Sequence, residues 1–137
     1  VSTMEGVNDE LRPWIAMTHP SGFGALDSRP VRQREVLFSS WLLAARIIPI
    51  DRHRLALDRV IPGVGFDEES TSWLQRRWRH ERRVEPHASG GCTVSDVVVV
   101  EPRVGVLRPL VVPVVRALFH HRHRRLMRRF RVGDGRR

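Results

Sequence analysis

The chain has 137 residues, enough to bury one hydrophobic core but too few for two ordinary domains. Hydrophobic residues make up 41% of it and four residues are tryptophan, a composition that argues against a disordered chain. The single cysteine, Cys92, excludes a disulfide within the chain and a metal site built from cysteines alone.

The net charge of +9 is unevenly distributed. Residues 1–102 contain 13 arginines and 14 acidic residues, whereas residues 103–137 contain 11 arginines and one acidic residue, Asp134. The excess positive charge therefore belongs to the C-terminal segment. An anionic partner, if there is one, would bind there.

The first 17 residues carry apolar side chains at helical spacing: Met4, Val7, Leu11, Trp14 and Ile15. Asn8, followed by two acidic residues, is typical of a helix N-terminus. Pro13 cannot lie deep in a helix, so it fits either the first turn of a helix or a break between two short helices, and the expected fold has two short helices here. Residues 19–33 contain two prolines and two glycines without periodicity, which predicts a long irregular loop.

Residues 36–50 are rich in apolar and aromatic side chains and predict a strand or a pair of strands. Residues 53–60 and 66–72 flank a Pro-Gly turn and predict a hairpin. A second hairpin is predicted from residues 73–84 and 92–101, which flank the turn at residues 86–91. The middle of the chain therefore predicts a series of antiparallel strands.

Residues 105–131 predict one long amphipathic helix. Its apolar line consists of Leu107, Val111, Val114 or Val115, Leu118, Leu126 and Phe130. Arg122 interrupts this line and must either pair or extend to solvent. The predicted fold class is thus α+β: a curved antiparallel sheet wrapped around a long C-terminal helix. We expect one domain over residues 1–131 and a disordered basic tail over 132–137.

The hairpin around residues 86–91 determines which side chains share a face. If its strands fold about Ala88, His80 faces Asp96, and Trp78 and Arg82 lie on the same side. A histidine paired with a carboxylate could orient a ligand or transfer a proton, which makes His80 and Asp96 the candidate catalytic residues. The simpler interpretation is a satisfied polar network within the core.

The run His120–Arg125 has two further interpretations. As a metal site it is poor, because the guanidinium groups repel a cation and no acidic or cysteine ligand accompanies His120 and His123. As a patch for nucleic acid or an anionic membrane it is better, since an arginine-rich helix neutralises phosphates. No helix-turn-helix, zinc or RNA-binding signature accompanies it, and no phosphate loop or nucleophile elbow occurs in the chain.

Five short motifs occur in order along the chain. They are residues 6–13 (GVNDELRP) with Met17 and Pro20, 40–43 (SWLL) running to Pro49 and Asp51, 78–82 (WRHER), 94–96 (VSD) and 118–126 (LFHHRHRRL). In order and spacing they resemble the START-like superfamily of helix-grip proteins, which are related to birch pollen allergen and are also called SRPBCC. The likeness is to its bacterial polyketide cyclase/dehydrase-like and lipid-transport-like members.

This resemblance implies a hydrophobic cavity between the sheet and the C-terminal helix, which binds a lipid, a sterol or a polyketide-like molecule. It implies no cofactor, and most such proteins lack a defined catalytic set. The alternative is a cyclase/dehydrase-like enzyme that uses His80 and Asp96. By position, the cavity lining would be Trp41, Trp78, His80, Arg82, Asp96, Val98, Val111, Val115 and Phe119.

The chain departs from the superfamily pattern at its start, because no strand precedes the first helix. The expected sheet therefore lacks its first strand and has an unpaired edge, which is compatible with a monomer or a homodimer. We expect a cytoplasmic protein, since no apolar run approaches the ~20 residues of a membrane-spanning helix and no leader pattern opens the chain.

Overall fold

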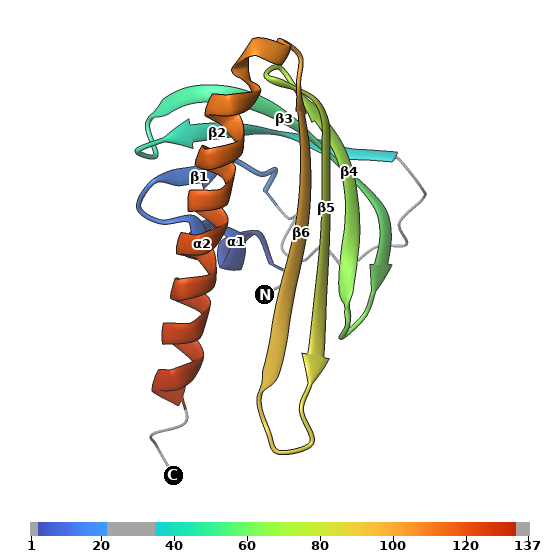
Figure 1. Ribbon diagram of the computed structural model, residues 1–137, viewed down its shortest axis with the longest axis vertical. Helices are drawn as coiled ribbons and strands as arrows, with labels where there is room; N and C mark the ends of the chain where they lie inside the picture. The colour runs from blue at the N-terminus through green and yellow to red at the C-terminus, as the bar shows by residue number, and fades with distance from the viewer. Residues whose placement is uncertain (1–2, 22–34, 134–137) are drawn as a thin grey trace.

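The computed structural model describes residues 3–21 and 35–133. Its elements in chain order are α1 (Met4–Leu11), β1 (Ile15–Met17), β2 (Glu35–Ala44), β3 (Ile48–Ile61), β4 (Gly65–Ser72), β5 (Gln75–Pro86), β6 (Cys92–Pro102), the 3₁₀ turn η1 (Gly105–Leu107) and α2 (Arg108–Gly133). The six strands form one antiparallel sheet in sequence order. The sheet curls into a half-barrel, and α2 runs along its open side with α1 between them (Figure 1). The predicted α+β fold is confirmed.

The N-terminal region differs from the expectation of two short helices. The described residues contain a single short helix there, α1, capped by Thr3, whose hydroxyl accepts a hydrogen bond from the backbone N–H of Gly6 at 3.1 Å. Residues 15–17 are not helical but form β1, which pairs with β2. Asn8 is not a cap: its side-chain amide bonds both the N–H and the C=O of Met17, at 2.7 and 2.9 Å, and joins β1 to α1. Most of the irregular loop expected at 19–33 lies outside the described residues.

The predicted hairpins are present. Residues 36–50 form a strand pair, β2 and the start of β3, joined by a tight turn in which Ala45 and Arg46 have positive φ angles of 48° and 69°. The hairpin of β3 and β4 turns at residues 62–64, close to the predicted position. The predicted helix at 105–131 corresponds to η1 and α2. Helix α2 continues through Gly133, so residues 132 and 133, which were expected in the disordered tail, are helical, and residues 134–137 lie outside the described residues.

The register of β5 and β6 differs from the prediction by two residues. Arg82 faces Asp96, whereas His80 faces Val98, because the hairpin is centred on Ser89 rather than Ala88. The turn is closed by a hydrogen bond from the N–H of His87 to the C=O of Gly91 at 3.0 Å. A shift of two residues preserves the alternation of the strand, so the predicted face is correct although the predicted partners are not.

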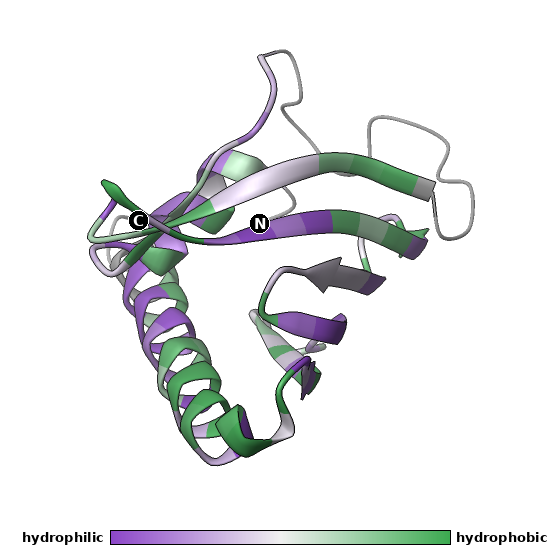
Figure 2. Cartoon of the chain, turned by 90° about the horizontal axis from the view of Figure 1, so that it is seen from above, coloured by the Kyte–Doolittle hydropathy of each residue, from purple (hydrophilic) through white to green (hydrophobic). Residues whose placement is uncertain are grey.

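The hydrophobic core lies on the concave face of the sheet. Its buried members are Met4 of α1 and Phe38, Leu55, Leu57 and Phe66 of the strands. Helix α2 is apolar in its first half and rich in arginine in its second (Figure 2). In the described part of the chain β6 pairs with β5 alone, so the outer edge of β6 is unpaired as expected. No helix among the described residues is both long enough and apolar enough to cross a membrane.

Candidate ligand-binding cavity and its polar network

A cavity of about 340 Å³ lies between the concave face of the sheet and the two helices. Most of its lining is apolar: Met4, Val7 and Leu11 from α1, Leu55, Leu57 and Phe66 from the strands, and Leu110, Val111, Val114, Val115, Leu118 and Phe119 from α2. Its polar lining consists of Asp51, His53, Glu68, Gln75, His80 and Arg122. A few placed polar groups among apolar walls are typical of a small-molecule site.

One end of the cavity is open to solvent through apolar side chains. Ile50 and Leu74 are each 45% exposed, and Leu110 and Val114 are 66% and 64% exposed, yet all four line the cavity. They come from the start of β3, the turn between β4 and β5, and the first turns of α2. This end therefore forms an apolar mouth.

Glu68 of β4 is the centre of one part of the polar network. Its carboxylate contacts His53 Nε2 at 2.7 Å, accepts from the hydroxyl of Ser70 at 2.6 Å and lies 3.5 Å from His80 Nδ1. Burial by itself would raise the pKa of Glu68, but hydrogen bonds from His53 and His80 outweigh burial and hold that pKa well below its ordinary value. Glu68 is therefore ionised inside the protein.

Asp96 of β6 is the centre of the second part. Arg82 donates to its two oxygens at 2.8 and 2.9 Å, while His80 and His123 donate from Nε2 at 2.8 and 2.6 Å. Burial opposes the ionised form, yet the bonds from Arg82 and His80 hold the pKa of Asp96 far below its ordinary value. For His80, burial lowers the pKa, but the bonds to Asp96 and Glu68 prevail and raise it above 6.5.

Glu10 of α1 connects the network to both helices. Its buried carboxylate accepts from Nε of Arg122 in α2 and lies 3.5 Å from Nη1 of Arg82 in β5. Burial and the neighbouring positive charge of Arg82 lower the pKa of Arg122. The arginine that interrupts the apolar line of α2 is therefore paired within the protein.

The structure brings five of the nine predicted lining residues to the cavity: Trp78, His80, Val111, Val115 and Phe119. The other four do not line it. Arg82 is buried behind it in the ion-pair network, and Trp41 packs edge-on against Trp73, with ring centroids 5.0 Å apart. Asp96 and Val98 line a different depression, between β6 and α2.

The catalytic candidates His80 and Asp96 are within hydrogen-bond distance of each other. They do not face each other across the strands, however, but lie at diagonal positions, because Arg82 is the residue that faces Asp96. Both oxygens of Asp96 already accept bonds from cationic groups, so Asp96 has little capacity to act as a base. This arrangement matches the interpretation of a satisfied polar network.

Sequence reasoning missed His53, Glu68, Gln75 and Glu10. A signal existed for Glu68, since polar residues alternate along β4 with their side chains on the buried face: Glu68, Ser70 and Ser72. Gln75 gave no such signal, because an irregularity in the pairing of β5 with β6 between Gln75 and Arg77 interrupts the alternation. As a result, Gln75 is buried while Arg77 is partly exposed.

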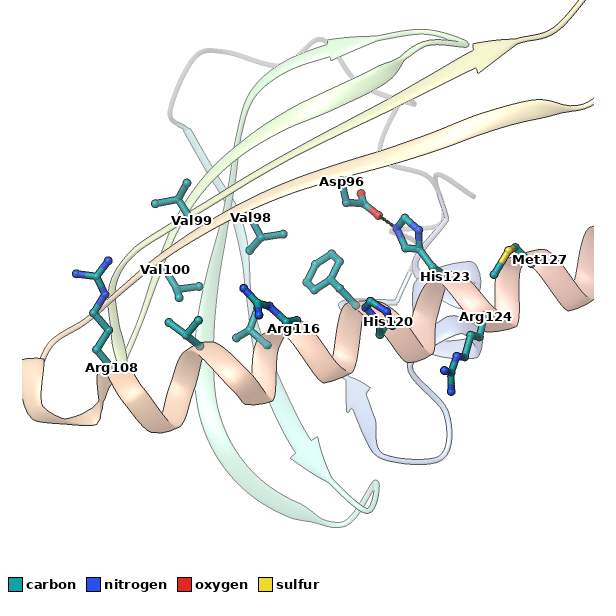
Figure 3. Close-up of a pocket in the computed structure, with 13 residues that line it drawn as sticks. Asp96, Val98, Val99, Val100, Arg108, Arg116, His120, His123, Arg124 and Met127 are labelled. Carbon is teal, nitrogen blue, oxygen red and sulfur yellow. Dashed lines mark hydrogen bonds and ion pairs between the residues drawn. The ribbon is translucent and has the colours of Figure 1, made fainter.

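A wider groove of about 750 Å³ separates the edge strand β6 from α2 (Figure 3). Val98 and Val100 form its strand side, Arg108 and Arg116 contribute from the helix, and the ion pair of Asp96 with His123 crosses its base. Among the described residues, no cluster of three or more histidine, cysteine or acidic side chains is arranged to hold a metal ion.

Exposed basic residues occur four positions apart along α2, and the first three of them line the groove beside β6. They are Arg116, His120, Arg124 and Arg128, which we call the basic stripe. None of the four has an ion-pair partner among the described residues, whereas Arg125 and Arg129 both pair with Asp9 of α1.

These features define a class: an α+β protein in which a curled antiparallel half-barrel and a long C-terminal helix surround an apolar cavity. The chain belongs to the family described as a domain of unknown function, DUF8410, whose model matches residues 1–130. Comparisons with curated proteins and with solved structures gave no match.

Proposed function

We propose that this protein binds a small apolar molecule in the cavity between the sheet and α2. The observation that carries the proposal is the apolar lining of a 340 Å³ space that opens at an apolar mouth. Ligand sites typically have volumes of about 300–1,000 Å³. The resemblance to START-like proteins supports the same ligand class.

The apolar walls would supply most of the affinity, at ~25 cal/mol for each Å² of apolar surface removed from water. The charged groups at the cavity wall would add little attraction for a ligand, because each already has a partner within the protein. Glu68 pairs with His80, His80 also pairs with Asp96, and Arg122 pairs with Glu10. A neutral ligand is therefore favoured over an ion.

A pair of helix variants tests this proposal. Val111 lines the cavity, and the next residue, Val112, lines only the outer depressions. We expect Val111→Phe to abolish binding of the neutral fluorescent probe N-phenyl-1-naphthylamine, and Val112→Phe to leave it unchanged. Native mass spectrometry and solvent extraction of purified wild-type protein should also release an apolar molecule. Equal binding by both variants would show that the probe binds elsewhere and would overturn the proposal.

A second candidate, binding of a polyanion such as nucleic acid or an anionic vesicle, has one observation in its favour. The basic stripe is continuous and unpaired within the described residues. Binding through it should fall steeply with salt, and Arg116→Gln combined with Arg124→Gln should reduce the slope by about two. Binding that does not depend on salt would exclude this candidate.

A further inference from the structure

Gln75 is the first residue of β5 and is buried, with 7% of its surface exposed. The irregularity in strand pairing between Gln75 and Arg77 places its side chain on the cavity side, next to Leu74 of the mouth. Its backbone N–H donates to the hydroxyl of Ser72 at 2.9 Å, which fixes the start of the strand. Bulges of this kind often redirect one side chain toward a functional site.

The side-chain oxygen of Gln75, Oε1, has no hydrogen-bond partner. Among the described residues it is the one buried side-chain nitrogen or oxygen of which this is true. The other acceptors at the cavity wall are occupied. Asp51 accepts from the N–H of Leu74 at 3.2 Å and from the hydroxyl of Ser72 at 2.6 Å, and Glu68 accepts from His53 and Ser70. A buried acceptor without a donor lowers the stability of the folded state, so a group that binds in the cavity and donates to this oxygen would recover that free energy.

We propose that Oε1 of Gln75 accepts a hydrogen bond from a hydroxyl group on the apolar molecule that occupies the cavity. The inference rests on the proposed function and narrows its ligand class to apolar alcohols. A neutral donor fits better than an ammonium group, because the guanidinium of Arg122 lines the same cavity and neither lining carboxylate lacks a partner. With the hydroxyl near Leu74, the hydrocarbon part would extend inward toward Phe66 and Leu57.

Two isomers of one composition separate hydroxyl recognition from general apolar binding. 1-Octanol and heptyl methyl ether contain the same atoms, but only the alcohol donates a hydrogen bond. Their dissociation constants are measured by displacement of N-phenyl-1-naphthylamine from the wild-type protein, from Gln75→Met and from Arg76→Met. Arg76 is the exposed neighbour at the same irregularity, which makes it a matched control.

We expect the preference for the alcohol over the ether to be at least fivefold smaller in Gln75→Met than in wild type, and unchanged in Arg76→Met. The same preference in wild type and Gln75→Met would overturn the assignment of Gln75 while leaving the cavity proposal intact. Failure of the probe and both isomers to bind wild type would instead overturn the proposed function.

A measurement on the wild-type protein alone covers the case in which Gln75→Met does not fold. The ratio of alcohol to ether binding is compared with the ratio of their partition from water into hexadecane, where no acceptor exists. We expect the protein to favour the alcohol at least fivefold more than hexadecane does. Equal ratios would show that no group in the cavity recognises the hydroxyl, and would overturn the assignment.

Discussion

At the scale of single residues, Asp96 connects more of the polar network than its neighbours do. One buried carboxylate accepts bonds from Arg82 and His80 of β5 and from His123 of α2. Its removal would leave the buried guanidinium of Arg82 with only the 3.5 Å contact to Glu10, and breaking a buried pair in this way costs more than the bonded pair gains by forming. Asp96 thus joins the edge strand to its neighbour and to the long helix.

We expect Asp96→Asn to lower the free energy of unfolding by about 3–5 kcal/mol, because the neutral amide leaves the buried charge of Arg82 with only the longer contact to Glu10, at 3.5 Å. Urea denaturation followed by circular dichroism measures this. Glu101→Gln on the same strand is the control: its pair with Arg76 is exposed, so the loss should be below about 1 kcal/mol. Similar losses for the two variants would contradict a special role for the buried carboxylate.

The ionised groups predict a stability maximum in weak acid. Glu68 and Asp96 have pKa values below their ordinary 4.5 and 3.8, so their contribution is complete above about pH 4.5 and is lost as pH falls through the folded-state values. The pKa of His80 is raised above 6.5, so its contribution is complete below that pH and is lost as pH rises through the folded-state value. Unfolding free energy should therefore be greatest between about pH 4.5 and 6.5.

Urea titrations from pH 3 to pH 9 measure this profile. His80→Gln should remove the decline on the alkaline side, while His87→Gln in the exposed β5–β6 turn should retain it. An unchanged alkaline decline in His80→Gln would assign the titration to another group.

At the scale of elements, the sequence predicted helices and strands correctly where local patterns determine the secondary structure. Alternating apolar residues and Pro-Gly punctuation predicted β3 to β6 within a few residues, and helical spacing predicted α2. It failed where tertiary contacts determine the secondary structure or the burial of a side chain. Residues 15–17 follow a helical pattern but become a strand, because Asn8 and β2 satisfy their backbone groups. The buried position of Gln75 depends on an irregularity that no local pattern marks.

The turn between β3 and β4 offers a prediction about close backbone packing. At Gly65, with φ of 155°, an added Cβ would lie 1.8 Å from the carbonyl oxygen of Arg82, whereas at Gly63, with φ of 75°, it would meet nothing within 4 Å. We expect Gly63→Ala to cost about 1–2 kcal/mol from backbone strain alone. Gly65→Ala should cost more than about 3 kcal/mol, because β4 and β5 must also separate. Equal losses in thermal or urea unfolding would contradict this close approach.

At the scale of the whole molecule, Glu10 and Arg122 show why the cavity could not be predicted in detail. They are 112 positions apart in sequence, yet their ion pair joins α1 to α2, the two helices that line the cavity. The long helix and the curved sheet were predictable from pattern, and so were five of the lining residues. The volume left between the elements depends on such distant pairs, and so does the depth at which Arg82 and Asp96 lie.

The architecture therefore predicts that ligand and stability are linked. The buried apolar core is small, and the cavity separates part of the sheet from α2, so an occupant would supply packing that the chain lacks. With 1-octanol at 100 times its dissociation constant, the unfolding free energy should rise by about 2.7 kcal/mol, because the alcohol binds only the folded state. Urea titrations with and without the alcohol measure this increase. Val112→Phe should retain the increase and Val111→Phe should lose it, since only the second substitution fills the cavity. An equal increase in both variants would place the alcohol outside the space between sheet and helix.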